Sequence, residues 1–168
     1  MVRLFFYEVN DEYINYLLKF DNRIMYTKEE DRRFKRKYIG ILFQIETNYY
    51  IAPFSSYKPE KHDKMKDTID FIKIGNKAII NLNNMFPVPL EVIQKVNIEK
   101  ISEIGYKNLL RDEYKLCIPK FNKIIENSHI LYKQVTIHDM PIKNRCCNFK
   151  LLEQKCQEYN KNRYTTEM

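Results

Sequence analysis

Residues 38–58 read YIGILFQIETNYYIAPFSSYK, and this stretch decides the fold. Two apolar segments, Tyr38 to Ile45 and Tyr49 to Pro53, flank the polar triplet Glu46-Thr47-Asn48. Apolar and β-branched runs on both sides of a short polar connection predict an antiparallel hairpin. The second strand then leads into a loop, Phe54 to Lys58, that carries two adjacent serines.

Further strands are expected on both sides of this hairpin. Each is a short run rich in β-branched or aromatic residues, and two of them flank the turn Gly75-Asn76. The segments are Val2 to Val9, Ile69 to Ile74, Ala78 to Leu82 and Leu90 to Ile98.

Three stretches carry apolar residues at intervals of three and four, which predicts helices. They run from Asp11 through Phe20, over a long segment after Gly105, and from Asn148 through about Tyr159. Asp11 and Asn148 are suitable N-caps, whereas Pro119 is expected to kink or divide the long segment. Most of the predicted strands lie in the first part of the chain and most of the helices follow them. This order favours a single α+β domain over residues 1–168, a twisted antiparallel sheet packed by helices.

The composition suits one globular core and an anionic partner. The 168 residues are 44% hydrophobic, and a chain of this length hides about 70% of the surface that it exposes when unfolded. Lys and Arg number 29 against 22 Asp and Glu, which gives a formal net charge of +7. Such an excess attracts polyanions, and for nucleic acid it predicts salt-dependent affinity.

Neither a membrane span nor a secretion signal is expected. The longest stretch without a charged residue, Ala78 to Leu90, has 13 residues, whereas a membrane helix needs about 20 apolar ones. The start MVRLFFYEVN lacks the shape of a signal peptide. The four cysteines form no C-x-x-C pair and are interpreted as reduced thiols. We therefore expect a cytoplasmic protein without a metal or another cofactor.

The common enzyme signatures are missing from the sequence. It has no G-x-S-x-G elbow, P-loop, Rossmann glycine fingerprint or H-E-x-x-H motif, and its histidines (His62, His129, His138) are too scattered to assign a Ser-His pair. What remains is the serine loop with Lys58, behind a basic run, Arg32 to Lys37, in which five of six residues are positive. Such donors suit a site that positions a phosphodiester and stabilises charge on its oxygens.

Each of these features also has an ordinary structural interpretation. Ser55 and Ser56 could be turn hydroxyls after a strand, and the basic run could be a solvated surface loop. His62 is more often a surface residue than a general base. Tyr57, beside the serine loop, is the tyrosine that we assign to stacking on a base.

Four groups of motifs stand in a specific order along the chain. They are Tyr38-Ile39-Gly40-Ile41, then Tyr50 to Ser56 with Lys58, then Ile79-Ile80-Asn81-Leu82 with Met85-Phe86-Pro87-Val88, and finally Cys147 to Leu152. Together they closely resemble the ToxN/AbiQ family, the endoribonuclease toxins of type III toxin-antitoxin and abortive-infection systems. The resemblance spans essentially the whole chain.

The resemblance implies a fold similar to the Kid/MazF toxins, a partly open barrel. It also implies sequence-specific, metal-independent cleavage of single-stranded RNA, with the 2'-hydroxyl as nucleophile and with 2',3'-cyclic phosphate and 5'-hydroxyl ends. The implied partner is a repeated pseudoknot RNA antitoxin, which the toxin processes and which closes with it into a cyclic hetero-oligomer. Cellular and phage RNA would be the substrate, DNA and membranes would not be partners, and the role would be phage defence.

The resemblance also assigns catalytic residues. Ser56 falls at the family's essential serine, Ser55 at the Ser or Thr before it, and Lys58 at the lysine two places after it. Arg36 falls at the basic position before the Ile-Gly strand. We expect Arg36 and Lys58 to stabilise charge and Ser56 to orient the phosphate, with possible participation in proton transfer, while the general base is not identified.

Two departures from the family pattern concern proline. Tyr57 stands where a proline is common after the serine, and Lys37 precedes Tyr38 where a proline is often found. The second departure leaves Lys35 and Lys37 as alternatives to Arg36.

The expected RNA-binding residues are Arg32, Arg33, Lys35, Lys37, Tyr57 and Lys61. Candidates for a longer RNA groove, with a solvated face as the equal alternative, are Lys61, Lys64, Lys66, Lys150, Lys155, Lys161 and Arg163.

Two other classes of function compete with cleavage. A non-catalytic module for single-stranded RNA would use the same basic loop, and Ser56 would then be only a turn residue. A toxin that acts on a gyrase-like protein target would need no phosphate site, so the basic cluster would be unexplained.

Overall fold

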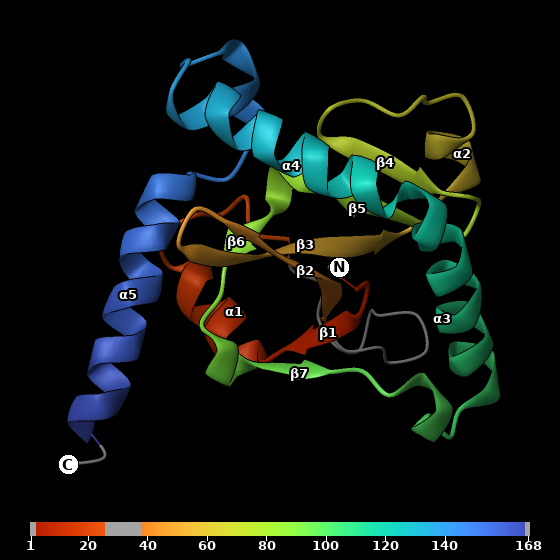
Figure 1. The fold of residues 1–168 in the computed structure, drawn as a ribbon, viewed down its shortest axis with the longest axis horizontal. Helices are drawn as coiled ribbons and strands as arrows, with labels where there is room; N and C mark the ends of the chain where they lie inside the picture. The colour runs from red at the N-terminus through yellow and green to blue at the C-terminus, as the bar shows by residue number, and fades with distance from the viewer. Residues whose placement is uncertain (1–2, 26–37, 167–168) are drawn as a thin grey trace.

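The computed structural model describes residues 3–25 and 38–166, which form one antiparallel sheet with helices around it (Figure 1). The strand order along the sheet is β4-β5-β3-β2-β1-β7, and β6 pairs with β3 beside this path. The strands are β1 (Phe6–Val9), β2 (Ile39–Ile45), β3 (Asn48–Ser56), β4 (Phe71–Ile74), β5 (Ala78–Asn81), β6 (Phe86–Pro87) and β7 (Ile93–Lys95).

Helices and short 3₁₀ turns surround this sheet. Figure 1 shows α3 and α5 standing at opposite ends of the sheet and α4 crossing beside β4 and β5. The helices are α1 (Asp11–Leu18), α2 (Pro59–His62), α3 (Ile104–Cys117), α4 (Phe121–Thr136) and α5 (Phe149–Thr166). The 3₁₀ turns are η3 (Leu82–Asn84), η4 (Leu90–Val92), η5 (Ile98–Lys100), η6 (Ile118–Lys120) and η7 (Pro141–Arg145).

The expected α+β class is confirmed. The strand pairs found in the described residues are antiparallel, and the helices pack on the sheet. Over these residues the outer strands β4 and β7 do not pair with each other, so the sheet is not closed. None of the helices in the described part of the chain is both long enough and apolar enough to cross a membrane.

The hairpin predicted at the start of the quoted stretch is confirmed. In β2 the side chains of Ile39, Ile41, Phe43 and Ile45 are buried, as the period of two in a strand requires. The turn is shorter than predicted, because Asn48 already pairs with Ile45 as the first residue of β3. A two-residue turn needs unusual backbone angles, and its first residue, Glu46, has a φ of 53°.

Gly40 lies at a point where β2 and β3 come very close together. A Cβ atom at this position would be 2.5 Å from the carbonyl oxygen of Ala52, which is main chain and cannot move aside. We expect Gly40→Ala to lower the free energy of unfolding by about 1–3 kcal/mol, as overpacking does. Urea denaturation measures the change. Gln44→Ala, at an exposed position of the same strand, is the control and should change stability by less than about 1 kcal/mol.

Several predicted ends of strands and helices were wrong. The strand predicted from Val2 begins at Phe6, and the one predicted from Leu90 to Ile98 is only β7, between the 3₁₀ turns η4 and η5. Both strands lie near one edge of the sheet, where β7 has β1 as its partner and fewer ladder bonds hold it extended. The cap of α1 is Asn10, whose Oδ1 accepts the Glu12 N–H at 2.7 Å, and not Asp11.

The helical half follows its sequence signals closely. Pro119 divides the long segment, as predicted, because it lies in the 3₁₀ turn η6 between α3 and α4. Asn148 caps α5, since its Oδ1 accepts the Leu151 N–H at 3.2 Å. The predicted stripe of α5, including Phe149 and Cys156, is buried, although the helix continues past Tyr159 to Thr166.

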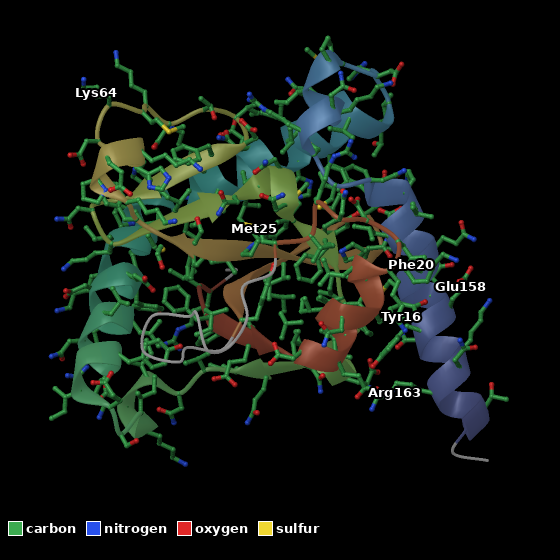
Figure 2. All side chains as sticks on the ribbon, turned by 180° about the vertical axis from the view of Figure 1, so that it is seen from behind. Tyr16, Phe20, Met25, Lys64, Glu158 and Arg163 are labelled. Carbon is green, nitrogen blue, oxygen red and sulfur yellow. The ribbon has the colours of Figure 1, made fainter. Side chains whose placement is uncertain are left out.

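The first helix packs against the last one. The Tyr16 hydroxyl donates to the carbonyl of Lys155 at 2.9 Å, and the Lys155 ammonium lies 4.6 Å from the centre of the Phe20 ring. Figure 2 shows Tyr16 and Phe20 beside α5, next to Glu158. Tyr13, Ile14 and Leu17 of α1 are fully buried, whereas Phe20, just after the helix end at Leu18, stays 37% exposed.

Candidate functional site

Ser55 and Ser56 are the last two residues of β3, not part of a loop as predicted. They pair with Ile79 and Ala78 of β5, which prolongs β3 beyond its hairpin with β2. Consecutive strand residues point to opposite faces, so the two hydroxyls leave the strand on different sides. The serine hydroxyls therefore start from a fixed main chain, which favours a defined direction for any phosphate contact.

The two serine hydroxyls have different surroundings. Asn81 of β5 donates its Nδ2 to the Ser55 Oγ at 2.9 Å, which orients that hydroxyl. Within residues 3–25 and 38–166 we find no hydrogen-bond partner for the Ser56 Oγ. Both side chains are half-buried. Asn81 was not predicted as a site residue, because only the pairing of β3 with β5 brings it to Ser55.

The chain after Ser56 turns sharply into α2. The carbonyl of Lys58 accepts the N–H of Lys61 at 3.0 Å and that of His62 at 2.8 Å. The N–H of Lys58 donates to Nδ1 of His62 at 2.8 Å. The Lys58 side chain is exposed, and no partner for its ammonium occurs in the described part of the chain. The main chain at Lys58 is thus fixed while its charge is available to a ligand.

His62 is buried, so its interpretation as a surface residue was wrong. Only 5% of the residue is exposed, and the centre of its ring lies 5.4 Å from that of Tyr57 and 5.8 Å from that of Phe71. Burial is the main cause that lowers the pKa of His62. A neutral imidazole accepts at one nitrogen and donates at the other, which matches its bond to Lys58.

Tyr57 is held by polar contacts on its ring and its hydroxyl. The hydroxyl donates to the Asp63 carboxylate, and this bond raises the pKa of Tyr57. The Lys73 ammonium of β4 lies 5.6 Å from the ring centre and also donates to the carbonyl of Met65 at 3.1 Å. An ordered, partly exposed ring next to Lys58 is compatible with stacking on a base, which stays a prediction.

The basic residues expected at this site fall into two groups. Lys61, like Lys64 and Lys66, is exposed in or after α2. The other group lies outside the described residues and consists of Arg32, Arg33, Lys35, Arg36 and Lys37. Its nearest described neighbour is Tyr38, whose carbonyl accepts the N–H of Val9 at 2.9 Å.

The candidates for a longer RNA groove do not form one surface. Figure 2 shows Lys64 and Arg163 at opposite corners of the molecule. On α5, Lys150 pairs with Glu153 at 3.3 Å and Lys155 pairs with Glu158 at 2.8 Å. An RNA that used both groups would have to pass around the protein.

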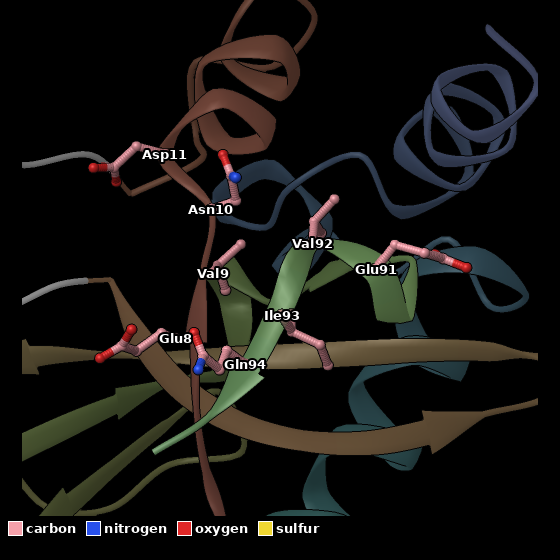
Figure 3. Close-up of a pocket in the computed structure, with 8 residues that line it drawn as sticks. All are labelled: Glu8, Val9, Asn10, Asp11, Glu91, Val92, Ile93 and Gln94. Carbon is pink, nitrogen blue, oxygen red and sulfur yellow. The ribbon is translucent and has the colours of Figure 1, made fainter. Parts of the chain in front are cut away.

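A separate hollow of about 610 Å³ lies beside β1 and β7 (Figure 3). Its lining includes three carboxylates, those of Glu8, Asp11 and Glu91, and none of the expected site residues. In the described residues, no group of three or more His, Cys, Asp or Glu side chains is placed to hold a metal ion. All four cysteines are free and buried, and burial raises the pKa of Cys146 to about 12.

Comparison with known families and structures gives a match over nearly the whole chain. Residues 5–157 match the model of the family described as "Toxin ToxN, type III toxin-antitoxin system". The chain is 29% identical over 164 residues to the endoribonuclease ToxN of Bacillus thuringiensis subsp. kurstaki, covering 92% of this chain and 83% of that protein.

Two solved structures have the same fold over the same extent. One comes from a type III toxin-antitoxin system in which a non-coding RNA pseudoknot selectively inhibits the toxin. It has a TM-score of 0.81 and 27% identity over 95% of this chain and 99% of that one. The other is AbiQ, a lactococcal anti-phage endoribonuclease of a type III system, with a TM-score of 0.76, 27% identity and the same coverage.

Proposed function

Because this chain belongs to the ToxN family of toxins of type III toxin-antitoxin systems, we propose that it is a sequence-specific endoribonuclease that cleaves single-stranded RNA. The observation that carries the proposal is the family match over residues 5–157, which includes the whole of β3 and the turn at Lys58. The endoribonuclease names of its relatives, ToxN and AbiQ, support the same activity.

The proposed reaction is attack of the ribose 2'-hydroxyl on the adjacent phosphorus. The bond from phosphorus to the 5'-oxygen breaks, which leaves a 2',3'-cyclic phosphate and a 5'-hydroxyl. This reaction needs in-line geometry, a group that takes the proton of the 2'-hydroxyl, and positive charge beside the crowded phosphate oxygens. It does not need a metal ion to supply the nucleophile.

Three side chains are proposed for the phosphate itself. Ser56 donates a hydrogen bond to a phosphate oxygen, because its hydroxyl extends from a fixed strand and no partner for it occurs in the described residues. Lys58 supplies a point charge from a fixed main chain two residues later. Arg36 would supply a second, bidentate cation. Ser55 leaves the strand on the opposite side, so its proposed role is indirect: its bond with Asn81 would hold the strand end that carries Ser56.

We propose an RNA antitoxin as the inhibitor of this site. The relative of known structure that is inhibited by an RNA pseudoknot supports this assignment, as does the net charge of +7. The antitoxin would be a repeated pseudoknot that the toxin processes, and toxin and RNA would close into a ring. Defence against phage is proposed from the anti-phage relative AbiQ. Similarity of the fold to the Kid/MazF toxins stays a prediction from the sequence.

The proposed chemistry predicts the ends of the product and an indifference to chelators. Cleavage should persist in excess EDTA and should leave a 2',3'-cyclic phosphate, because the nucleophile is a hydroxyl of the RNA. Mass spectrometry of the short product identifies its end. A 3'-hydroxyl end, or activity that returns only with added Mg²⁺, would contradict the proposal and indicate metal-assisted hydrolysis.

A non-catalytic module for single-stranded RNA is the second candidate. The exposed ammoniums of Lys58 and Lys61 and the ordered Tyr57 ring would serve such a module equally well. This module differs from a ribonuclease in the role of Ser56. In a module that only binds, replacing Ser56 would have no effect beyond RNA affinity.

A further inference from the structure

We infer that His62 is a positioning residue of the cleavage site, which holds the main chain of Lys58 so that its ammonium faces the phosphate bound at Ser56. This inference rests on the proposed ribonuclease function. It assigns no bond between His62 and RNA: His62 acts through Lys58, and its contribution is geometric.

The hydrogen bonds between His62 and Lys58 form a closed pair. The main-chain N–H of Lys58 donates to the His62 Nδ1, and the main-chain N–H of His62 donates to the Lys58 carbonyl, both at 2.8 Å. Lys58 is the N-cap residue of α2, and Pro59 is the first helical residue. A side chain that reaches back to the N–H of the N-cap is the arrangement of a capping box, here made by an imidazole four residues on.

The ring of His62 is itself fixed by packing from two elements. It contacts the ring of Tyr57, which follows the strand end, and the ring of Phe71 in β4. Only 5% of His62 is exposed, so the imidazole cannot turn away from Lys58 without leaving this contact. The strand end, the turn and β4 are thereby joined at one buried ring. No other described side chain makes a hydrogen bond to the Lys58 main chain.

The bond to Lys58 exists only while His62 is neutral, because a protonated imidazole has no acceptor nitrogen. Burial, helped by the adjacent Lys61, lowers the pKa of His62 from its ordinary value of 6.5, whereas Glu60 acts in the opposite direction. The charged and titratable groups around the ring are Tyr57, Lys58, Glu60, Lys61, Asp63 and Lys73. Because the folded pKa lies below the unfolded one, the bond is fully present above pH 6.5 and is lost as the pH falls through the lowered pKa.

Loss of this bond would change the position of Lys58 without changing that of Ser56. Ser56 stays in the ladder of β3 with β5, so its hydroxyl keeps its place. Lys58 follows the strand end and has no ladder pair, so its direction depends on the turn. An error of about 1 Å in placing a catalytic group can cost about 100-fold in rate. RNA affinity, which depends on many phosphate contacts, should change little.

The test compares His62→Asn with His62→Leu in the full chain. The Asn side-chain oxygen can occupy the place of Nδ1 and accept the Lys58 N–H without titrating, whereas Leu has a similar size and no acceptor. Single-turnover cleavage of an RNA substrate is measured from pH 5 to 8, beside RNA affinity and the far-UV circular dichroism spectrum. His138→Asn, at an exposed histidine, is the control for loss of an imidazole.

We expect the wild type to lose cleavage rate on the acid side of pH 6.5, as the pH falls through the lowered pKa of His62. The Asn variant should keep the rate at pH 7.5 within about threefold and lose this acid limb, and the Leu variant should be about 10- to 100-fold slower at unchanged affinity. If the Leu variant is folded and has the wild-type rate and profile, the inference is wrong and the ribonuclease proposal stands.

Three further outcomes also decide the matter. An Asn variant that is folded but inactive would make His62 a general base instead of a positioning residue. If the Leu variant does not fold, the Asn variant alone decides, because retention of the wild-type acid limb by Asn would overturn the inference. A wild type that binds RNA but never cleaves it would remove the proposed function, and this inference with it.

Discussion

Replacing Ser56 with alanine is expected to lower the single-turnover rate of RNA cleavage at least about 100-fold and to abolish toxicity. The hydroxyl would be lost at the point where negative charge builds on the phosphate. The protein should fold normally, because the pairing of Ser56 with Ala78 is made by the main chain and no side-chain partner of Ser56 occurs in the described residues. Toxicity and cleavage are compared with the wild type at matched expression.

Ser102→Ala is a suitable control for this experiment, because Ser102 is an exposed serine far along the chain from the site. It should leave the rate unchanged. A folded Ser56→Ala protein that cleaves at the wild-type rate would remove the central assignment and would favour the non-catalytic RNA-binding module. A loss of less than about tenfold would assign Ser56 to positioning rather than to charge stabilisation or proton transfer.

Lys58→Ala and Arg36→Ala should slow the cleavage of bound RNA by about 100-fold while weakening RNA binding far less. Their proposed interaction is with charge that develops only in the transition state, so it contributes to rate more than to affinity. Lys61→Ala and Arg32→Ala should do the reverse. Arg36 and Arg32 lie outside the described residues, so their part of this prediction rests on the sequence.

A salt titration of RNA affinity beside single-turnover rates separates the two roles. Each phosphate contact that is lost should reduce the salt slope of log K by about 0.7 for single-stranded RNA. Lys61→Ala is the matched control for Lys58→Ala, because both lysines are exposed and lie three residues apart at the start of α2. If all four variants lower affinity equally and leave the rate of bound RNA unchanged, the basic residues form a docking surface and the catalytic roles of Arg36 and Lys58 are wrong.

The sequence by itself determined the features that neighbouring residues control. The β2–β3 hairpin follows from two apolar runs a few residues apart, and the division of the long helix follows from the missing N–H of Pro119. The start of α5 follows from the Asn148 side chain, which reaches a main-chain N–H three residues on. Family membership was also readable, because the order of its motifs is a property of the chain. Ends of elements were less accurate, as at β1 and β7, because pairing strands decide where a strand stops.

Only the tertiary structure decided how the candidate site is built. Ser55 and Ser56 are strand residues because β5, more than twenty residues later in the chain, supplies the ladder bonds that a loop would lack. For the same reason Asn81 reaches the Ser55 hydroxyl. His62 looks like a surface histidine in a charged stretch, yet it is buried and its ring contacts that of Phe71 in β4. The contacts of Ser55 with Asn81 and of His62 with Phe71 join residues whose separation in sequence carries no periodic signal, so they exist only once the sheet has formed.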